Sequence, residues 1–211
     1  MALQLIGAGG AIAEVDATFK ASRTSLRPAE VINWESFGAA SGALTLIAAA
    51  GPVFSLRNTG ANPLMVRRVQ IGFVTITAFT AAQALAYQLL KATGFTVSDS
   101  AGTALYTAGA NKHRSSFTNI ASAPDVRIAA AVALTAGTRT LEAVALGIAG
   151  GSSTGVGTSM PITPLLSHDA GDYPLILAQN EGLVIANTLL MGAAGVINLH
   201  VNIEFAEVTT Y

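Results

Sequence analysis

The sequence predicts an all-β protein, an antiparallel two-sheet jelly-roll sandwich with an extended N-terminal arm. The strongest observation is the segment from Ile197 to Phe205, in which apolar and polar residues alternate at every position. A strand places such alternating sets on opposite faces, whereas a helix would scatter both around its circumference. After residue 43, short apolar runs are separated by turn residues, as is typical of sandwiches and barrels.

Composition indicates one large domain that associates with other subunits. The chain has 211 residues, of which 51% are hydrophobic and only 11% are charged. This length is sufficient for a substantial core. A surface with so few charges is unusual for a freely soluble monomer, so we expect part of it to be buried in a homo-oligomer.

Several classes of protein are not expected. The chain has no cysteine, which excludes disulfides and thiolate metal sites, and the 11 basic residues are dispersed, which argues against nucleic-acid binding. The N-terminus lacks the basic region of a secretory signal. Two uncharged windows, 36–56 and 143–167, are long enough for membrane spans, but Gly and Pro interrupt both. We therefore expect no membrane insertion.

The first 41 residues differ from the remainder. They contain several charges, Pro28 and the only tryptophan, Trp34. We interpret residues 1–41 as an arm, with a short strand over 12–19, and residues 42–211 as the jelly-roll domain. Trp34 is a candidate interface residue, because large aromatic side chains often anchor contacts between proteins.

Strands in the first half of the domain are predicted from apolar runs bounded by turns. The run at 53–57 follows Gly51-Pro52, and the turn at 58–63 separates it from a long strand over 64–77. The segment 85–92 fits a strand slightly better than a helix. The predicted strands are 44–48, 53–57, 64–77, 85–92 and 95–98.

In the second half, residues 103–124 are polar and are predicted to form a long loop. Alternation from Val126 to Leu134 predicts a strand, and 140–149 is its expected hairpin partner. The Gly/Ser/Thr-rich segment 150–159 is predicted to be a loop. Further strands are expected at 175–178, 183–190 and 196–208, which makes roughly eight to ten strands, the number required by a jelly roll.

No motif favours catalysis or a cofactor. Gly7 to Gly10 lacks the remaining residues of a phosphate-binding loop. His113 and His200 have no acid or nucleophile partner in a recognisable motif. Glu204 and Glu207 are three residues apart in a predicted strand, so their side chains should point to opposite faces. We expect a protein that is not an enzyme and has no cofactor.

One segment leaves a cation site open. His168, Asp169 and Asp172 combine an imidazole and two carboxylates within five residues, and such groups can bind a divalent cation. A tight turn with Asp side chains bonded to their own backbone explains them as well. The turn is favoured, because no further ligands are evident.

Candidate interface residues come from three places. Arg67 and Arg68 form a small basic cluster that either docks an acidic partner or is simply solvated. The polar face of the last strand is short of charge for open solvent and is expected to meet a neighbouring subunit. The candidate interface residues are Trp34, Arg67, Arg68, Asn198, His200 and Asn202.

Three segments resemble jelly-roll structural proteins of tailed bacteriophage particles, in particular proteins that decorate or cement the head. They are 53–69, 95–103 and 180–188, the last followed by the alternating strand. The resemblance covers about residues 43–208. Its motifs are structural, so they do not distinguish a head decoration protein from a tail or fibre component.

The resemblance implies a virion component, commonly trimeric, that assembles in the host cytoplasm. Its partners would be the major capsid protein or other virion proteins, and its role would be to stabilise the capsid through contacts between subunits. A receptor-binding or glycan-binding module of a tail or fibre is the alternative, since jelly rolls also occur in lectins.

Overall fold

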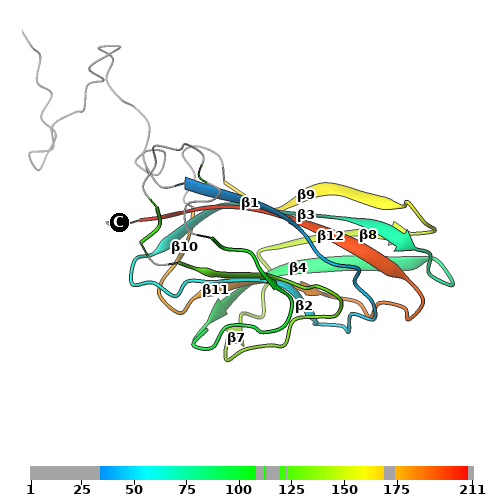
Figure 1. Ribbon diagram of the computed structural model, residues 1–211, viewed down its shortest axis with the longest axis horizontal. Coiled ribbons are helices and arrows are strands. Elements are labelled where there is room, and N and C mark those ends of the chain that lie inside the picture. The colour runs from blue at the N-terminus through cyan, green and yellow to red at the C-terminus, as the bar shows by residue number, and fades with distance from the viewer. Residues whose placement is uncertain (1–33, 108–111, 113–118, 122, 169–173, 209–211) are drawn as a thin grey trace, which may run out of the picture.

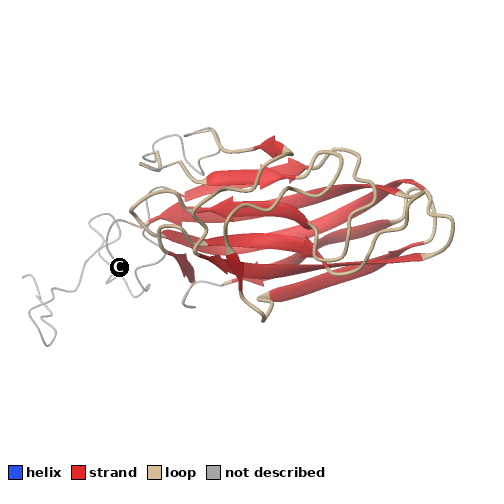
Figure 2. Cartoon of the chain, turned by 90° about the horizontal axis from the view of Figure 1, so that it is seen from below, coloured by secondary structure: helices blue, strands red, loops and turns tan. Residues whose placement is uncertain are grey.

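The computed structural model describes residues 34–107, 112, 119–121, 123–168 and 174–208. These residues form strands and loops without helices, arranged as two antiparallel sheets packed face to face (Figures 1 and 2). The predicted all-β class and the two-sheet sandwich are therefore confirmed.

The first sheet has five strands and is built around the two longest. β12 (Val196–Glu207) lies between β1 (Trp34–Ala40) and β3 (Leu64–Thr77). The other side of β3 pairs at one end with β10 (Leu175–Leu177) and along its middle with β9 (Ser159–Ser167). β12 is thus an inner strand, paired on both sides.

The second sheet has seven strands, several of them short. Its central strands are β2 (Pro52–Arg57), β11 (Gly182–Asn187) and β4 (Gln83–Thr93). β6 (Asp125–Ile128) and β5 (Thr103–Ala104) extend it beyond β2. On the other side of β4 lie β7 (Thr140–Leu141) and β8 (Gly147–Ser153).

The core fills the space between the sheets, and β12 contributes one face to it. The five apolar residues of the predicted alternation are each at most 1% exposed, which confirms the one-sided reading of this strand: Ile197, Leu199, Val201, Ile203 and Phe205. Phe205 stacks on Phe37 of β1, with ring centroids 5.6 Å apart. Across the sandwich, Phe73 of β3 lies 6.5 Å from Tyr87 of β4. Burial of these side chains supplies the main driving force for folding.

The arm predicted over 1–41 includes a strand of the sheet. β1 begins at Trp34 and pairs with β12 over seven residue pairs, so residues 34–40 belong to the sandwich. The charge of Glu35 obscured this strand in the sequence, yet Glu35 is fully buried and lies on the same side of β1 as Phe37. Residues 1–33, with the short strand expected at 12–19, lie outside the described residues.

Long-range pairing also changed several predicted strands. Residues 44–48 form one isolated bridge, from Leu44 to Ile197, and Leu46 has a φ of 50°, which ends any extended run. Residues 95–98 form no strand either. The expected hairpin between 126–134 and 140–149 is wrong, because β6 pairs with β2 and β5, while β7 and β8 pair with β4. The predicted loop over 150–159 holds the end of β8 and the start of β9.

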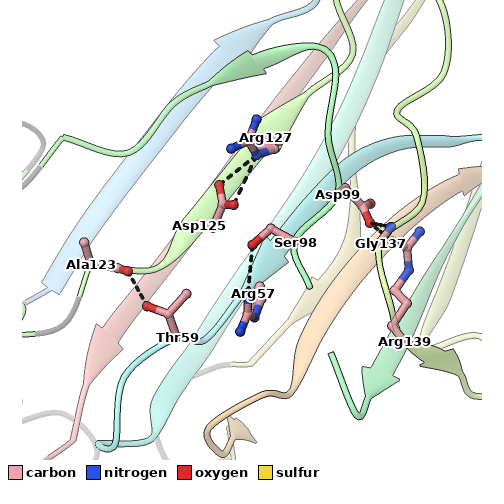
Figure 3. A network of polar contacts seen from close by, with 9 residues as sticks. All are labelled: Arg57, Thr59, Ser98, Asp99, Ala123, Asp125, Arg127, Gly137 and Arg139. Carbon is pink, nitrogen blue, oxygen red and sulfur yellow. Dashed lines mark hydrogen bonds and ion pairs between the residues drawn. The ribbon is translucent and has the colours of Figure 1, made fainter. Parts of the chain in front are cut away.

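Loops cover much of the outer face of the seven-stranded sheet (Figure 2). Phe95 packs on that face with Val184, Ala92 and Leu141. Polar contacts tie these loops down (Figure 3): the Arg57 guanidinium donates to Ser98 Oγ at 3.0 Å, and the Gly137 N–H donates to Asp99 Oδ1 at 2.9 Å. The part of this face over β11 and the end of β4 is therefore internal to the chain, whereas the outward residues of β8 are exposed.

The central contact in these loops is a buried ion pair. Arg139 bonds to Asp99, and their side chains are only 4% and 0% exposed. The Arg139 guanidinium also lies 5.1 Å from the centre of the Phe95 ring. Burial lowers the pKa of Arg139, which reflects the cost of holding its charge away from water.

Arg139→Met should destabilise the protein by about 3–5 kcal/mol, because it leaves the Asp99 carboxylate buried without its counter-charge. Denaturant unfolding measures the change. The double variant Arg139→Met with Asp99→Asn should recover part of the loss, since the orphaned charge is then absent. A loss below about 1 kcal/mol for the single variant, the range of exposed pairs, would contradict this role for the pair.

Candidate interaction face

The outward side of β12 presents the polar residues of the alternating segment. Asn198, His200 and Asn202 are half-buried and lie opposite the core-facing residues. His200 is paired with Ala40 of β1 on one side and Gly72 of β3 on the other. We call the outward side of β1, β12 and β3 the outer polar face.

Its β1 border is made of small side chains. Ser36, Gly38 and Ala40 are exposed and point the same way as the polar residues of β12. A Cβ on Gly38 would lie 2.9 Å from Oδ1 of Asn202, so the absence of a side chain lets Asn202 lie over β1. Asn198 donates from Nδ2 to the Ser41 carbonyl at 3.0 Å. The result is a low, polar surface on which the Asn198 amide is held in place.

The two predicted basic residues meet an acid of their own chain. Arg67 Nη1 lies 3.5 Å from Glu204 Oε1, and Arg68 Nε lies 3.8 Å from Glu204 Oε2. A register shift in the β3–β12 pairing occurs at this point, which brings both arginines beside one carboxylate. Glu204 therefore offsets one of the two positive charges that were expected to attract an acidic partner.

Sequence reasoning thus placed five of its six candidates on or beside one surface. Asn198, His200 and Asn202 share the outer polar face, and Arg67 and Arg68 border it through Glu204. Trp34 starts β1, and its backbone pairs with Ala206. Residues 1–33, where the remainder of the predicted arm lies, are outside the described part of the chain.

A buried polar cluster at one end of the sandwich was missed. Glu207 accepts hydrogen bonds from the Asn62 side chain at 3.1 Å and from the Ala121 N–H at 2.8 Å. Burial, together with the negative charges of Glu35 and Glu207, raises the pKa of Tyr106 to about 12. Glu204 and Glu207 have separate partners, as their spacing in the strand predicted.

Weak signals for this cluster were present in the sequence. Glu35 is two residues from Phe37, and Glu207 is two residues from Phe205. In a strand, residues two apart share a face, so both acids lie at the end of a core-facing row. The charge of Glu35 was read as a mark of the arm, and Glu207 was predicted only to point away from Glu204 in the last strand. A buried acid can be recognised only with its donors, and Tyr106 and Asn62 come from distant loops.

The possible cation site cannot be assembled from the described residues. The backbone N–H of His168 donates to the Arg67 carbonyl at 3.0 Å. Asp169 and Asp172 lie outside the described ranges. Within those ranges, no group of three or more His, Cys, Asp or Glu residues is arranged to hold a metal ion. His113 and the Gly7–Gly10 segment also lie outside. Among the residues described, no helix is long and apolar enough to cross a membrane.

Comparison with known proteins adds no assignment. The chain matches no protein-family model, no curated protein and no solved structure. Its function must therefore be inferred from the sandwich and its surfaces.

The raised pKa of Tyr106 predicts a loss of stability at alkaline pH. Unfolded tyrosine releases its proton near pH 10, whereas folded Tyr106 keeps it to about pH 12, so the unfolded state binds fewer protons between these values. The stabilisation that the protonated Tyr106 hydroxyl contributes to the fold is complete below pH 10 and is lost as the pH rises toward 12.

Tyr106→Phe should make this decline shallower, because phenylalanine has no proton to release. Unfolding free energies of both proteins, measured by denaturant titration from pH 8 to pH 12, test the difference. Tyr87 is present in both proteins, so its own ionisation cancels in the comparison. Parallel curves for the two proteins would show that Tyr106 ionises as freely in the folded chain as in the unfolded one.

Proposed function

We propose that this chain is a non-enzymatic structural protein of a bacteriophage particle, which stabilises the capsid by binding other subunits through its outer polar face. The observation that carries the proposal is the difference between the two sheets. Loops and a buried ion pair cover the seven-stranded sheet over β11 and the end of β4, whereas the outer polar face along β1 and β12 presents small, amide and imidazole side chains.

Charge on the outer polar face suits contact with other protein surfaces. Arg67, Arg68 and Glu204 pair among themselves, and the neighbouring residues of β1 and β12 are uncharged. Burying such a surface avoids the desolvation cost of unpaired charges. A protein that binds only the assembled shell stabilises it by mass action, and repeated copies add to the effect.

The strand order supports the jelly-roll assignment within this proposal. The longer strands pair in the orders β1-β12-β3-β9 and β2-β11-β4-β8, and successive strands of the chain mostly change sheets. Such interleaving is that of two Greek keys folded together. Fold alone does not give function, so the assignment supports the structural role without excluding other uses of the fold.

The alternative role as a glycan-binding tail component has less support. It would need a patch of exposed aromatic and acidic side chains. In the described residues, the large hydrophobic side chains that are exposed are aliphatic, among them Val97, Val132 and Leu190. The capsid role is therefore preferred.

His200→Glu should weaken binding to particles that lack the chain while leaving the fold intact, because it places an uncompensated charge on the outer polar face. Co-sedimentation with such particles measures binding, and circular dichroism checks the fold. Val97→Glu is the matched control, since Val97 is 56% exposed in a loop associated with the other sheet. Equal binding by His200→Glu and wild type would show that this face is not the binding surface.

Ile203→Asp should instead prevent folding. Ile203 is 1% exposed and pairs with Phe37 and Val69 in the core, where an unpaired carboxylate has no compensating partner. Loss of the cooperative unfolding transition is the expected result. A folded Ile203→Asp protein would contradict the one-sided reading of β12.

Deletion of residues 1–33 tests the proposed arm and keeps β1, which starts at Trp34. The shortened protein should keep a cooperative unfolding transition and lose most of its affinity for particles. Unchanged affinity would remove the arm from the proposal while leaving the outer polar face to be tested by His200→Glu.

A further inference from the structure

One edge of the seven-stranded sheet has the features of a strand that pairs with another chain. β8 pairs with β4 on one side, and no described strand pairs with its other side. Ile148, Gly150 and Ser152 are exposed, while Ala149 and Ser153 are buried. An exposed strand edge presents unpaired backbone donors and acceptors that can template another strand.

The direction of these backbone groups follows from the pairing of β4. The Thr188 N–H donates to the Ala86 carbonyl, so Ala86 points its backbone groups toward the β11 side. The Leu89 carbonyl accepts a hydrogen bond from the Leu146 N–H. The odd-numbered residues of β4 therefore point their backbone groups toward β8. Because Leu85, Tyr87 and Leu89 face Gly151, Ala149 and Gly147, the backbone groups of Ile148, Gly150 and Ser152 point away from β4.

The usual protections of an edge strand are missing from β8. Natural edges carry charges, prolines or strong bulges that discourage pairing. β9, the neighbouring edge of the other sheet, contains Pro161 and Pro164, and β5 and β7 are only two residues long. β8 has seven residues with neither proline nor charge.

The surroundings of this edge are apolar. Ile148 in β8 is 68% exposed, and Val144 and Leu146, in the bends that precede β8, are 77% and 37% exposed. None of the 11 basic and 12 acidic residues of the chain lies between 143 and 167. Val156, in the turn that follows β8, and Ile162 of β9 are also exposed.

These properties identify the occupant as a second copy of the chain. In a two-fold antiparallel contact, residues next to the axis meet their own symmetry mates, so a charge there would face a like charge. An edge without charge avoids this repulsion. A strongly charged partner would find no counter-charge here and would lose hydration without compensation.

We propose that β8 pairs antiparallel with β8 of a second copy about a two-fold axis at Gly150, which joins two seven-stranded sheets into one. In this register Ile148 of each copy faces Ser152 of the other, and Gly150 faces Gly150. All three outward-pointing residues then form hydrogen-bonded pairs. The Val144 end of one copy comes beside the Val156 end of the other, which covers apolar side chains on both.

This pairing goes beyond the proposed capsid role, since it describes how two copies meet whether or not they coat a particle. It joins copies in pairs and is compatible with a separate trimeric contact. The mass of the purified full-length chain tests it, whereas particle binding tests the proposed function, so failure of one is distinguishable from failure of the other.

Two variants block the edge without disturbing the core. Ile148→Lys places a charge on each copy at the contact, at a position that is 68% exposed. Ser152→Pro removes an outward N–H and leaves the β4 ladder intact. Ser152 is preferred to Gly150 for this purpose, because a Cβ on Gly150 would lie 2.9 Å from the Leu85 carbonyl oxygen. Val97→Lys, at an exposed apolar position outside the edge, is the control.

Light scattering after size exclusion should give an even number of 21.4 kDa chains for wild type and Val97→Lys, and half that number for Ile148→Lys and Ser152→Pro. The Gly150 and Ser152 amides should exchange with solvent slowly in wild type and rapidly in Ile148→Lys. Thermal unfolding confirms that each variant is folded. An odd number of chains in wild type, including a monomer, overturns the proposal, as does an unchanged mass in folded Ile148→Lys.

Discussion

The backbone ladder on both sides of β12 is the constraint on which the sandwich depends. Buried backbone N–H and C=O groups require partners, and β12 finds them in β1 on one side and β3 on the other. With those pairs in place, its apolar side chains face the second sheet as one row. The same ladder joins the start of the described chain to its end, since β1 and β12 are far apart in sequence.

Because β12 is fixed by its neighbours, its two sides have different uses. The inner side packs with Phe37 and Phe73, while Asn198, His200 and Asn202 on the outer side are half-buried. The centre of the second sheet lacks this division, because Val184 on the outer side of β11 is covered by Phe95 and its loop. Two sheets of similar construction thus differ in what they can offer to a partner.

The long elements could be predicted from sequence because their signals are local. β3 has the bounds that its apolar run predicts, and alternation correctly gave the inner face of β12. Both strands are long, and turn residues mark their ends clearly in the sequence. The polar face of β12 followed from the same period of two, which is why the candidate residues there fall together.

Other parts depended on contacts between distant residues and could not be read locally. β9 carries Pro161 and Pro164, which usually exclude an inner strand, but it lies at an edge where their missing N–H groups are tolerated. Glu35 hid β1 because an acid in a core-facing row is rare without buried polar partners, and Tyr106 lies about seventy residues away in sequence. The hairpin predicted after β6 is wrong because β6 pairs with β2, and β8 pairs with β4, so the two segments do not pair with each other.

The distribution of charge connects the fold to association. Several of the few charged side chains are used inside the chain: Asp99 with Arg139 under the loops, Glu204 with the arginines of β3, and Glu35 in the end cluster. The buried charges of Asp99, Arg139 and Glu35 hold no hydration shell on an open surface. The effective surface is therefore poorer in charge than an 11% composition suggests, and the 143–167 segment contains none. The net charge of −1 opposes association only weakly, and the geometry of the surface determines where copies contact each other.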